Sequence, residues 1–295
     1  MLAASVNVLV SLHRGYGLGD TVQVSAVLRH VVKYRPHWTI DFQAEPCRHN
    51  VGRGIVNNTF AFGDLYTSPH YDAEVEILLF DTFANWHDRP NTHVSSCLHD
   101  RFGMKWDHEC GRYQVNVSCK SVDAASALLR HSNCVAVHYE GVTCPEKKNL
   151  THEQANEICL AIKRLGREPV ILDWYDKSPL PFRRITTPQR WGTDPEMVCA
   201  VISQCEAFVG IDSGPSKCAS ATETPTLVVW TGHHPALYHD PSPNTTHLVP
   251  IGYHKLSPVR GSPNVVDFFE RNYNIREYDN NPTKAIKLWL MEMLK

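Results

Sequence analysis

A run of residues in the second half of the chain has the composition of an anion-binding turn. In the run VGIDSGPSK, an apolar stretch ends at Asp212. Ser213 suits a helix N-cap and Pro215 suits a first helical turn, so we expect a helix to begin here. Backbone N–H groups at that end, with Lys217 nearby, would attract a pyrophosphate, and Gly214 allows its close approach. An ordinary capped helix after a strand is the alternative.

A glycine-rich loop near the start of the chain carries a second candidate. Gly15, Gly17 and Gly19 follow an apolar stretch, and Asp20 comes directly after them. The dinucleotide-binding pattern G-x-G-x-x-G is matched only in part, because the third glycine comes one position early. Asp20 is therefore either a plain N-cap that opens a helix or a carboxylate placed by the loop for chemistry.

Two further loops carry basic side chains. Lys147 and Lys148 follow an apolar stretch, and at the carboxyl end of a strand they would reach a bound diphosphate; solvated surface lysines are the alternative. Gly232, His233 and His234 follow another apolar stretch. Adjacent histidines do not easily bind one ion from a regular element, and no H-E-x-x-H motif occurs. We therefore expect a loop that lines a cleft, and no metal site.

These candidates all follow short apolar stretches that we expect to be β-strands. Predicted strands lie at 6–12, 38–43, 74–80, 133–138, 169–173, 207–212 and 226–230. Predicted helices lie at 20–34, 122–131, 151–165, 194–204 and 282–295, with another starting at 213. The alternation of short strands with helices predicts an α/β fold of parallel sheets with helices on both faces.

The length of 295 residues favours two domains, and the strand pattern starts again near residue 133. We expect Rossmann-like domains at 1–133 and 134–281. The segment 282–295 is an amphipathic helix whose apolar face needs a partner, and we expect it to pack back on the first domain. Two such domains leave a cleft between the carboxyl ends of their sheets, where a ligand would bind.

Bulk composition excludes several classes of protein. A net charge of −2 provides no general attraction to nucleic acid, and no apolar stretch is long enough to span a bilayer. The apolar start at 1–10 suits a first strand better than a signal peptide. Ten cysteines contain no C-x-x-C pair, which argues against zinc-ribbon and thioredoxin-like folds. We expect a cytoplasmic protein with reduced cysteines.

With these residues in place, the chain resembles glycosyltransferase family 9, the bacterial ADP-heptose:lipopolysaccharide heptosyltransferases and their relatives. The run CEAFVGIDSGP at 205–215, followed by Ala219, Ala221, Pro225, an apolar strand and Gly232, looks like the donor motif of that family. The run GLGDT at 17–21, followed by Val27, Leu28, Arg29 and Pro36, resembles its amino-terminal loop and helix. Residues 45–130, where the acceptor is normally bound, show no secure correspondence.

The resemblance implies a GT-B fold and an inverting enzyme. Such an enzyme moves a heptose or related sugar from a nucleoside diphosphate sugar, ADP-linked in the family, to an acceptor hydroxyl. It needs no essential metal or other cofactor. Asp20 would be the catalytic base. The implied donor site consists of Asp212, Ser213, Gly214, Pro215, Lys217 and either Lys147 or Lys148.

The sequence departs from the family pattern at two of these positions. Lys217 stands where the family usually has histidine, and Ser213 stands where it usually has threonine. Serine preserves the hydroxyl, and Lys217 keeps a donor to phosphate while leaving the sugar open. Two other functions fit the same phosphate site: a GT-B nucleotide-sugar epimerase, and a non-catalytic nucleotide-sugar binding protein in which Asp20 would be dispensable.

Overall fold

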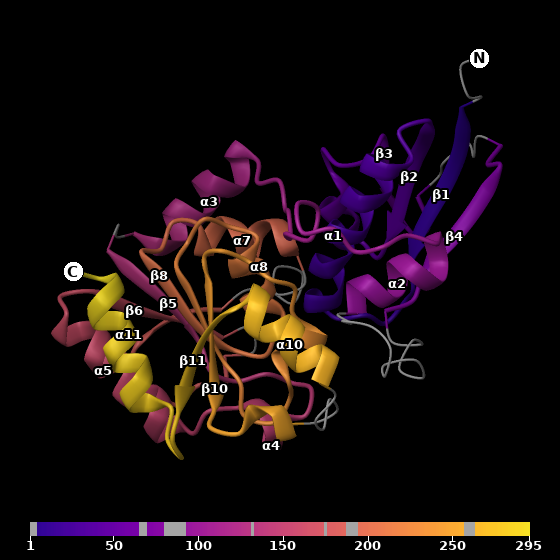
Figure 1. The fold of residues 1–295 in the computed structure, drawn as a ribbon. Coiled ribbons are helices and arrows are strands. Elements are labelled where there is room, and N and C mark those ends of the chain that lie inside the picture. Colours follow the sequence, from indigo (N-terminus) through magenta and orange to yellow (C-terminus); the bar gives the residue numbers. More distant parts are fainter. Residues whose placement is uncertain are drawn as a thin grey trace.

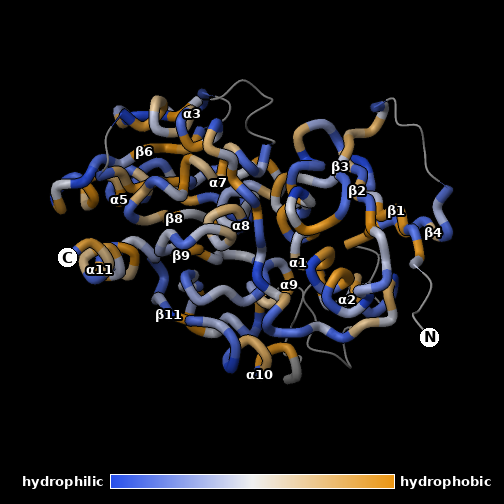
Figure 2. The backbone as a smooth tube through the Cα atoms, turned by 90° about the horizontal axis from the view of Figure 1, so that it is seen from above, coloured by the Kyte–Doolittle hydropathy of each residue, from blue (hydrophilic) through white to orange (hydrophobic). Residues whose placement is uncertain are grey.

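The computed structural model describes residues 5–64, 70–79, 93–130, 133–173, 176–186, 194–256 and 263–295. Within these residues the chain forms two parallel sheets, each flanked by helices, in two lobes that lie side by side (Figure 1). This architecture confirms the predicted α/β class. All described helices are too short or too polar to cross a membrane, and Figure 2 shows polar and apolar residues mixed along them.

The first lobe is built on a four-stranded sheet with the order β3-β2-β1-β4. Its elements are β1 (Val6–Leu12), α1 (Leu18–Tyr34), β2 (Trp38–Ala44), the 3-10 helix η1 (Arg48–Gly52), β3 (Asn58–Ala61), β4 (Ala73–Ile77) and α2 (His93–Phe102). The β-branched and apolar residues of β1 suit a pleated surface, and its buried side chains Val8, Val10 and Leu12 alternate along the strand.

The second lobe is built on a seven-stranded sheet with the order β11-β10-β9-β8-β5-β6-β7. Its strands are β5 (Cys134–His138), β6 (Glu168–Leu172), β7 (Arg183–Ile185), β8 (Ala207–Ile211), β9 (Thr226–Val229), β10 (Thr245–Pro250) and β11 (Asn274–Tyr278). Every residue of β5 and β8 is buried, because helices cover both faces of this sheet.

The described residues of the second lobe also form helices. They are α3 (Cys119–Leu129), α4 (Pro145–Lys148), α5 (His152–Arg164), α7 (Pro195–Ile202), α8 (Gly214–Ser220), α9 (Pro235–Tyr238), η3 (Tyr253–Lys255), α10 (Pro263–Asn272) and α11 (Thr283–Met293). Thr151 and Gln154 form a capping box at the start of α5, and Asp194 caps α7 through the Glu196 N–H.

Most predicted elements match the structure within a few residues. The last predicted residue of the strand at 74–80 and that of the helix at 122–131 lie outside the described residues. Helix α1 begins at Leu18, two residues before the predicted start, because Gly17 is its N-cap. The elements that the sequence pattern did not indicate are η1, β3, α2, α4, β7, α9, β10, η3, α10 and β11.

Two predictions about domain organisation were wrong. The C-terminal helix α11 packs on α5 of the second lobe, where Ile286 and Trp289 enter the core and Lys287 pairs with Glu157 at 2.7 Å. Figure 1 shows α11 on the side of that lobe away from the first lobe. The boundary at 133 lies too late, because α3 already packs on α7. The apolar side chains that these helices bury, Ile286, Trp289 and Leu290 of α11 and Ala125 and Leu129 of α3, enter cores that contain second-lobe residues.

Candidate functional site

A cavity of about 840 Å³ lies where the two lobes meet. The first lobe contributes Gly17, Leu18, Gly19, Asp20 and Arg48 to its wall, and the second lobe contributes the loops after β5, β6, β8 and β9. Its volume is typical of a site for a small molecule or cofactor. The predicted cleft at the carboxyl ends of the strands is therefore present.

The start of α1 and the start of α8 touch at the edge of this cavity. A Cβ atom added to Gly214 would lie 2.8 Å from Leu18 Cβ and 2.9 Å from Gly19 N. A Cβ atom added to Gly19 would lie 3.1 Å from Lys217 Nζ. Glycine at both positions is what lets the two helix ends approach so closely. The contact brings residues of the first lobe next to the Asp212–Lys217 turn.

Asp20 is the third residue of α1 and lines the cavity in a half-buried position. Its Oδ2 atom accepts a hydrogen bond from the Gly17 N–H at 2.9 Å. This bond satisfies a backbone donor at the start of the helix, as in a capping box. Asp20 thus has a capping role inside the helix, one turn later than a plain N-cap, and its carboxylate also faces the cavity.

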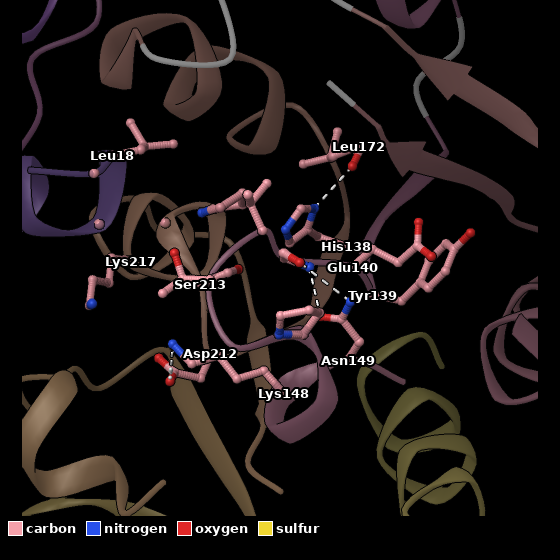
Figure 3. Close-up of a pocket in the computed structure, with 18 of the residues that line it drawn as sticks. Leu18, His138, Tyr139, Glu140, Lys148, Asn149, Leu172, Asp212, Ser213 and Lys217 are labelled. Atoms are coloured by element: carbon pink, nitrogen blue, oxygen red, sulfur yellow. Dashed lines mark hydrogen bonds and ion pairs between the residues drawn. The ribbon is translucent and has the colours of Figure 1, made fainter. Parts of the chain in front are cut away.

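Asp212 follows β8 directly and contacts two basic side chains. Its Oδ2 atom lies 3.0 Å from Lys148 Nζ and 3.1 Å from His233 Nδ1. The three side chains are largely buried, with exposed fractions of 6% for Asp212, 14% for Lys148 and 12% for His233. Figure 3 shows Lys148 and Asp212 meeting end to end below Ser213. The loops after β5, β8 and β9 converge in this cluster.

Lys217 adds a further positive charge on the side of the first lobe. It is 6% exposed and lies in α8, beside Leu18 in Figure 3. Burial lowers the pKa of Lys217, while the carboxylates of Asp20 and Asp212 oppose this shift. Among the described residues, its ammonium group has no hydrogen-bond or ion-pair partner. A buried cation of this kind favours an anionic ligand.

The charge state of Asp212 is set by the same cluster. Burial would raise the pKa of this carboxyl, but the hydrogen bond from His233 and the charges of Lys148 and Lys217 outweigh it. The pKa therefore lies well below its usual range, and Asp212 is ionised at neutral pH. One carboxylate thus faces two lysines and a histidine, which leaves the turn able to accept a ligand with negative charge.

Tyr238 covers the cluster from the C-terminal end of α9. Its ring lies 5.8 Å from Lys148 Nζ and 4.9 Å from the ring of His233, at an interplanar angle of 32°. Burial raises the pKa of Tyr238 to about 12, so its hydroxyl stays protonated. Tyr238 belongs to the run 231–239, in which a cleft-lining loop is predicted, but the sequence pattern does not single it out for the site.

The structure separates the two lysines predicted for the donor site. Lys148 lines the cavity, whereas Lys147 is exposed and does not belong to the cavity wall. The carbonyl oxygen of Lys147 accepts a hydrogen bond from Thr231 Oγ1. Gly232 lies against that same carbonyl, because an added Cβ would approach it to 2.8 Å. Gly232 therefore supports the loop from behind and does not line the cavity.

The predicted histidine pair is also divided. His233 lines the cavity, but His234 is fully buried and faces the apolar core, where it lies 5.0 Å from the ring of Phe269. Its Nδ1 atom accepts the Ala236 N–H as the N-cap of α9, and burial lowers its pKa to about 4. Placing His234 in the cleft was wrong, because neighbouring residues here point in opposite directions. The other predicted donor-site residues, Ser213, Gly214 and Pro215, line the cavity.

Arg48 is a cavity residue that sequence reasoning missed. It opens η1, in the part of the chain where no motif could be assigned, and its Nη1 atom donates to the Tyr16 carbonyl. Arg48 therefore ties η1 to the glycine-rich loop that precedes Asp20. Among the described residues, no group of three or more His, Cys, Asp or Glu side chains could hold a metal ion.

Two parallel α/β lobes with a cavity at the carboxyl ends of their strands define the GT-B architecture. A glycosyl transferase family 9 structure from Veillonella parvula superposes with a TM-score of 0.69 at 12% identity, covering 100% of this chain and 98% of that one. E. coli ADP-heptose lps heptosyltransferase II superposes with a TM-score of 0.58 at 13% identity, covering 90% of this chain and 99% of that one. E. coli heptosyltransferase WaaC with ADP superposes with a TM-score of 0.56 at 14% identity, covering 90% of this chain and 100% of that one.

These likenesses establish the fold that the family resemblance implied. The neighbours are glycosyltransferases and heptosyltransferases, and they extend over both lobes of this chain. No family model matches the sequence, and no curated protein matches it. The likeness is therefore one of three-dimensional structure.

Proposed function

We propose that this protein is an inverting glycosyltransferase that moves a sugar from a nucleoside diphosphate sugar to an acceptor hydroxyl. One observation supports this most strongly: a carboxylate of one lobe, Asp20, lines the same cavity as the basic cluster of the other lobe. A sugar whose diphosphate lies on Lys148 and Lys217 would reach toward the first lobe, where Asp20 can receive an acceptor proton.

The proposed reaction is a single displacement. The acceptor oxygen attacks the anomeric carbon as its proton passes to Asp20, and the bond from that carbon to the diphosphate oxygen breaks. Attack on the face opposite the leaving group inverts the anomeric centre. Lys148 and Lys217 stabilise the negative charge that develops on the diphosphate, in a site that contact between the lobes shields from water.

The donor that we propose is ADP-linked, with heptose or a related sugar. Support comes from the two E. coli neighbours, one named for ADP-heptose and the other determined with ADP. The acceptor is a hydroxyl compound bound by the first lobe. The cytoplasm is the compartment that we propose, because all ten cysteines are free thiols and such thiols persist in reducing compartments.

We further propose that the transfer needs no metal ion. Lys148 and Lys217 supply the positive charge that a cation would otherwise bring to the diphosphate. Turnover in the presence of EDTA tests this point. Activity within about twofold of the untreated protein supports it, and a complete loss that added metal reverses would contradict it.

The experiment that tests the function begins with candidate donors. Purified protein is incubated with ADP-, GDP-, UDP- and CDP-sugars, with and without acceptor extracts, and free nucleoside diphosphate is measured. A transferase releases the diphosphate in proportion to the acceptor, whereas an epimerase or a binding protein releases none in steady state. Lys217→Met should abolish most of this release and weaken diphosphate binding, since methionine keeps the side-chain volume without the charge.

A further inference from the structure

His233 has a geometry that separates its two ring nitrogens. Nδ1 lies 3.1 Å from Asp212 Oδ2, and a carboxylate at low pKa can only accept a hydrogen bond, so Nδ1 carries a proton. Among the described residues, Nε2 has no hydrogen-bond partner. His233 lines the cavity, whereas the unpartnered Nε2 of its neighbour His234 is sealed in the core.

The ring of His233 is held in place on two sides. Asp212 fixes the Nδ1 edge, and Tyr238 packs on the ring with centroids 4.9 Å apart. Asp212 is itself anchored by Lys148, and only 6% of its side chain is exposed. An aspartate in this arrangement fixes the orientation of the imidazole ring.

We propose that His233, protonated on both ring nitrogens when the diphosphate is bound, donates an Nε2–H hydrogen bond to the departing diphosphate, and that Asp212 is a positioning residue for His233 and Lys148. This inference rests on the proposed function and assigns roles within the same site. Asp212 Oδ2 contacts Lys148 Nζ and His233 Nδ1, and the donors that can meet the diphosphate around it are Lys148, Lys217 and His233 Nε2. Asp212 thus acts through His233 in the loop after β9, a residue that the sequence pattern indicated only as part of a cleft-lining loop.

Two amide substitutions of His233 test the proposal, because the amide nitrogen of each takes the place of one of the two ring nitrogens. The amide nitrogen of His233→Gln reaches the Nε2 position, and that of His233→Asn reaches the Nδ1 position beside Asp212. ADP, GDP, UDP and CDP are first tested with the unaltered protein. The nucleoside diphosphate that binds it serves as the probe. Its affinity and that of the matching nucleoside are measured by calorimetry for both variants, with His254→Asn, an exposed position on η3, as the control.

We expect His233→Asn to weaken diphosphate binding about tenfold, while His233→Gln stays within about threefold of the unaltered protein, since only glutamine restores a donor to the phosphate. Nucleoside affinity should change in neither variant, which also shows that both have folded. Because charge builds on the leaving group in the transition state, His233→Asn should lower kcat more than it raises the KM of the donor.

The reverse ranking overturns the inference. If His233→Asn binds the diphosphate normally and His233→Gln does not, the ring serves only to hold Asp212 and the loop. Equal affinity in both variants and the unaltered protein also overturns it. When that result comes with donor turnover by the unaltered protein, the proposed function stands and only the role of His233 fails. If the unaltered protein binds none of the four diphosphates, the proposed function fails and this inference fails with it.

Discussion

Arg53 and Glu196 form an ion pair between the two lobes, with Arg53 Nη1 3.0 Å from Glu196 Oε2. The other oxygen of Glu196 accepts hydrogen bonds from Ser118 N and Oγ and from Ser121 Oγ, at 2.6–3.0 Å. Burial would raise the pKa of Glu196, but the bonds from Ser118, Ser121 and Arg53 outweigh it and lower the pKa. This carboxylate on α7 therefore joins the first lobe, the connecting segment and the start of α3.

We expect Glu196→Ala to lower the free energy of unfolding by about 2–3 kcal/mol, because four hydrogen-bond donors lose a buried anionic acceptor. Arg53→Gln should cost less than about 1 kcal/mol, since half of the arginine side chain is exposed. Urea unfolding measures both. Glu157→Ala, which removes an exposed ion pair with Lys287, is the matched control and should change stability by under about 0.5 kcal/mol. Similar values for Glu196 and Glu157 would mean that the interlobe cluster adds nothing beyond a surface pair.

Acid should destabilise the second lobe through buried histidines. The neutral ring of His239 donates from Nδ1 to the Asp240 carbonyl at 2.9 Å and lies 3.1 Å from Ser220 Oγ at Nε2. Burial lowers its pKa to about 4, and burial also lowers the pKa of His234 to about 4. Between pH 6.5 and 4 the unfolded chain therefore binds more protons than the folded one, so stability falls as the pH falls.

The slope of the free energy of unfolding against pH measures the effect of these histidines. Each such histidine contributes up to about 1.4 kcal/mol per pH unit to the fall in the free energy of unfolding in that window. Urea unfolding at pH 7.5, 6 and 5 measures this fall. His239→Gln should reduce the slope by about one such contribution, whereas the exposed His254→Gln should leave it unchanged. An unaltered slope in His239→Gln would show that this ring is protonated in the folded protein or is not buried.

The contact between α1 and α8 predicts a strong effect of one methyl group. In Gly214→Ala, the new Cβ would lie 2.8 Å from Leu18 Cβ and 2.9 Å from Gly19 N, so the helix ends must move apart. We expect a loss of about 1–3 kcal/mol in stability and at least about a tenfold loss in turnover. Gly141→Ala, whose Cβ would meet nothing nearer than 3.6 Å, is the stability control. Wild-type turnover in Gly214→Ala would mean that the lobes need not touch here.

Local signals in the sequence located most of the site. Ser213 and Pro215 marked a helix start after a strand, and the structure has β8 and α8 on either side of that point. Such signals work because caps and prolines act over one or two residues. The carboxyl ends of parallel strands share one edge, and this rule placed Asp212, Lys148 and His233 together.

The errors concern the direction of side chains and the packing of distant elements. Lys147 and Lys148 are adjacent in the sequence, but only Lys148 turns toward Asp212. An amphipathic face shows that a helix needs a partner and does not say which, so α11 could not be assigned to α5 in advance. Arg48 was missed because its position depends on the contact of η1 with the loop at Tyr16, which no local pattern encodes.

Substitution of Asp20 distinguishes a glycosyltransferase from a non-catalytic binding protein most clearly. Asp20→Asn removes the base but keeps the side-chain shape, and the amide oxygen can still accept the Gly17 N–H bond. Stability should therefore change by less than about 1 kcal/mol, whereas Asp20→Ala, which loses the capping bond as well, should cost about 1 kcal/mol more.

Turnover of Asp20→Asn should fall by about a hundredfold or more, because general base catalysis contributes at least that much. Diphosphate affinity should stay within about threefold, since Lys148, Lys217 and His233 are unchanged. Calorimetry, urea unfolding and donor turnover on the same preparation separate the three quantities. Near-normal turnover would leave Asp20 with its capping role alone and place the base elsewhere. Loss of diphosphate binding together with turnover would instead show that Asp20 supports the donor site itself, through the glycine-rich loop or through the charge of Lys217, and is not a base alone.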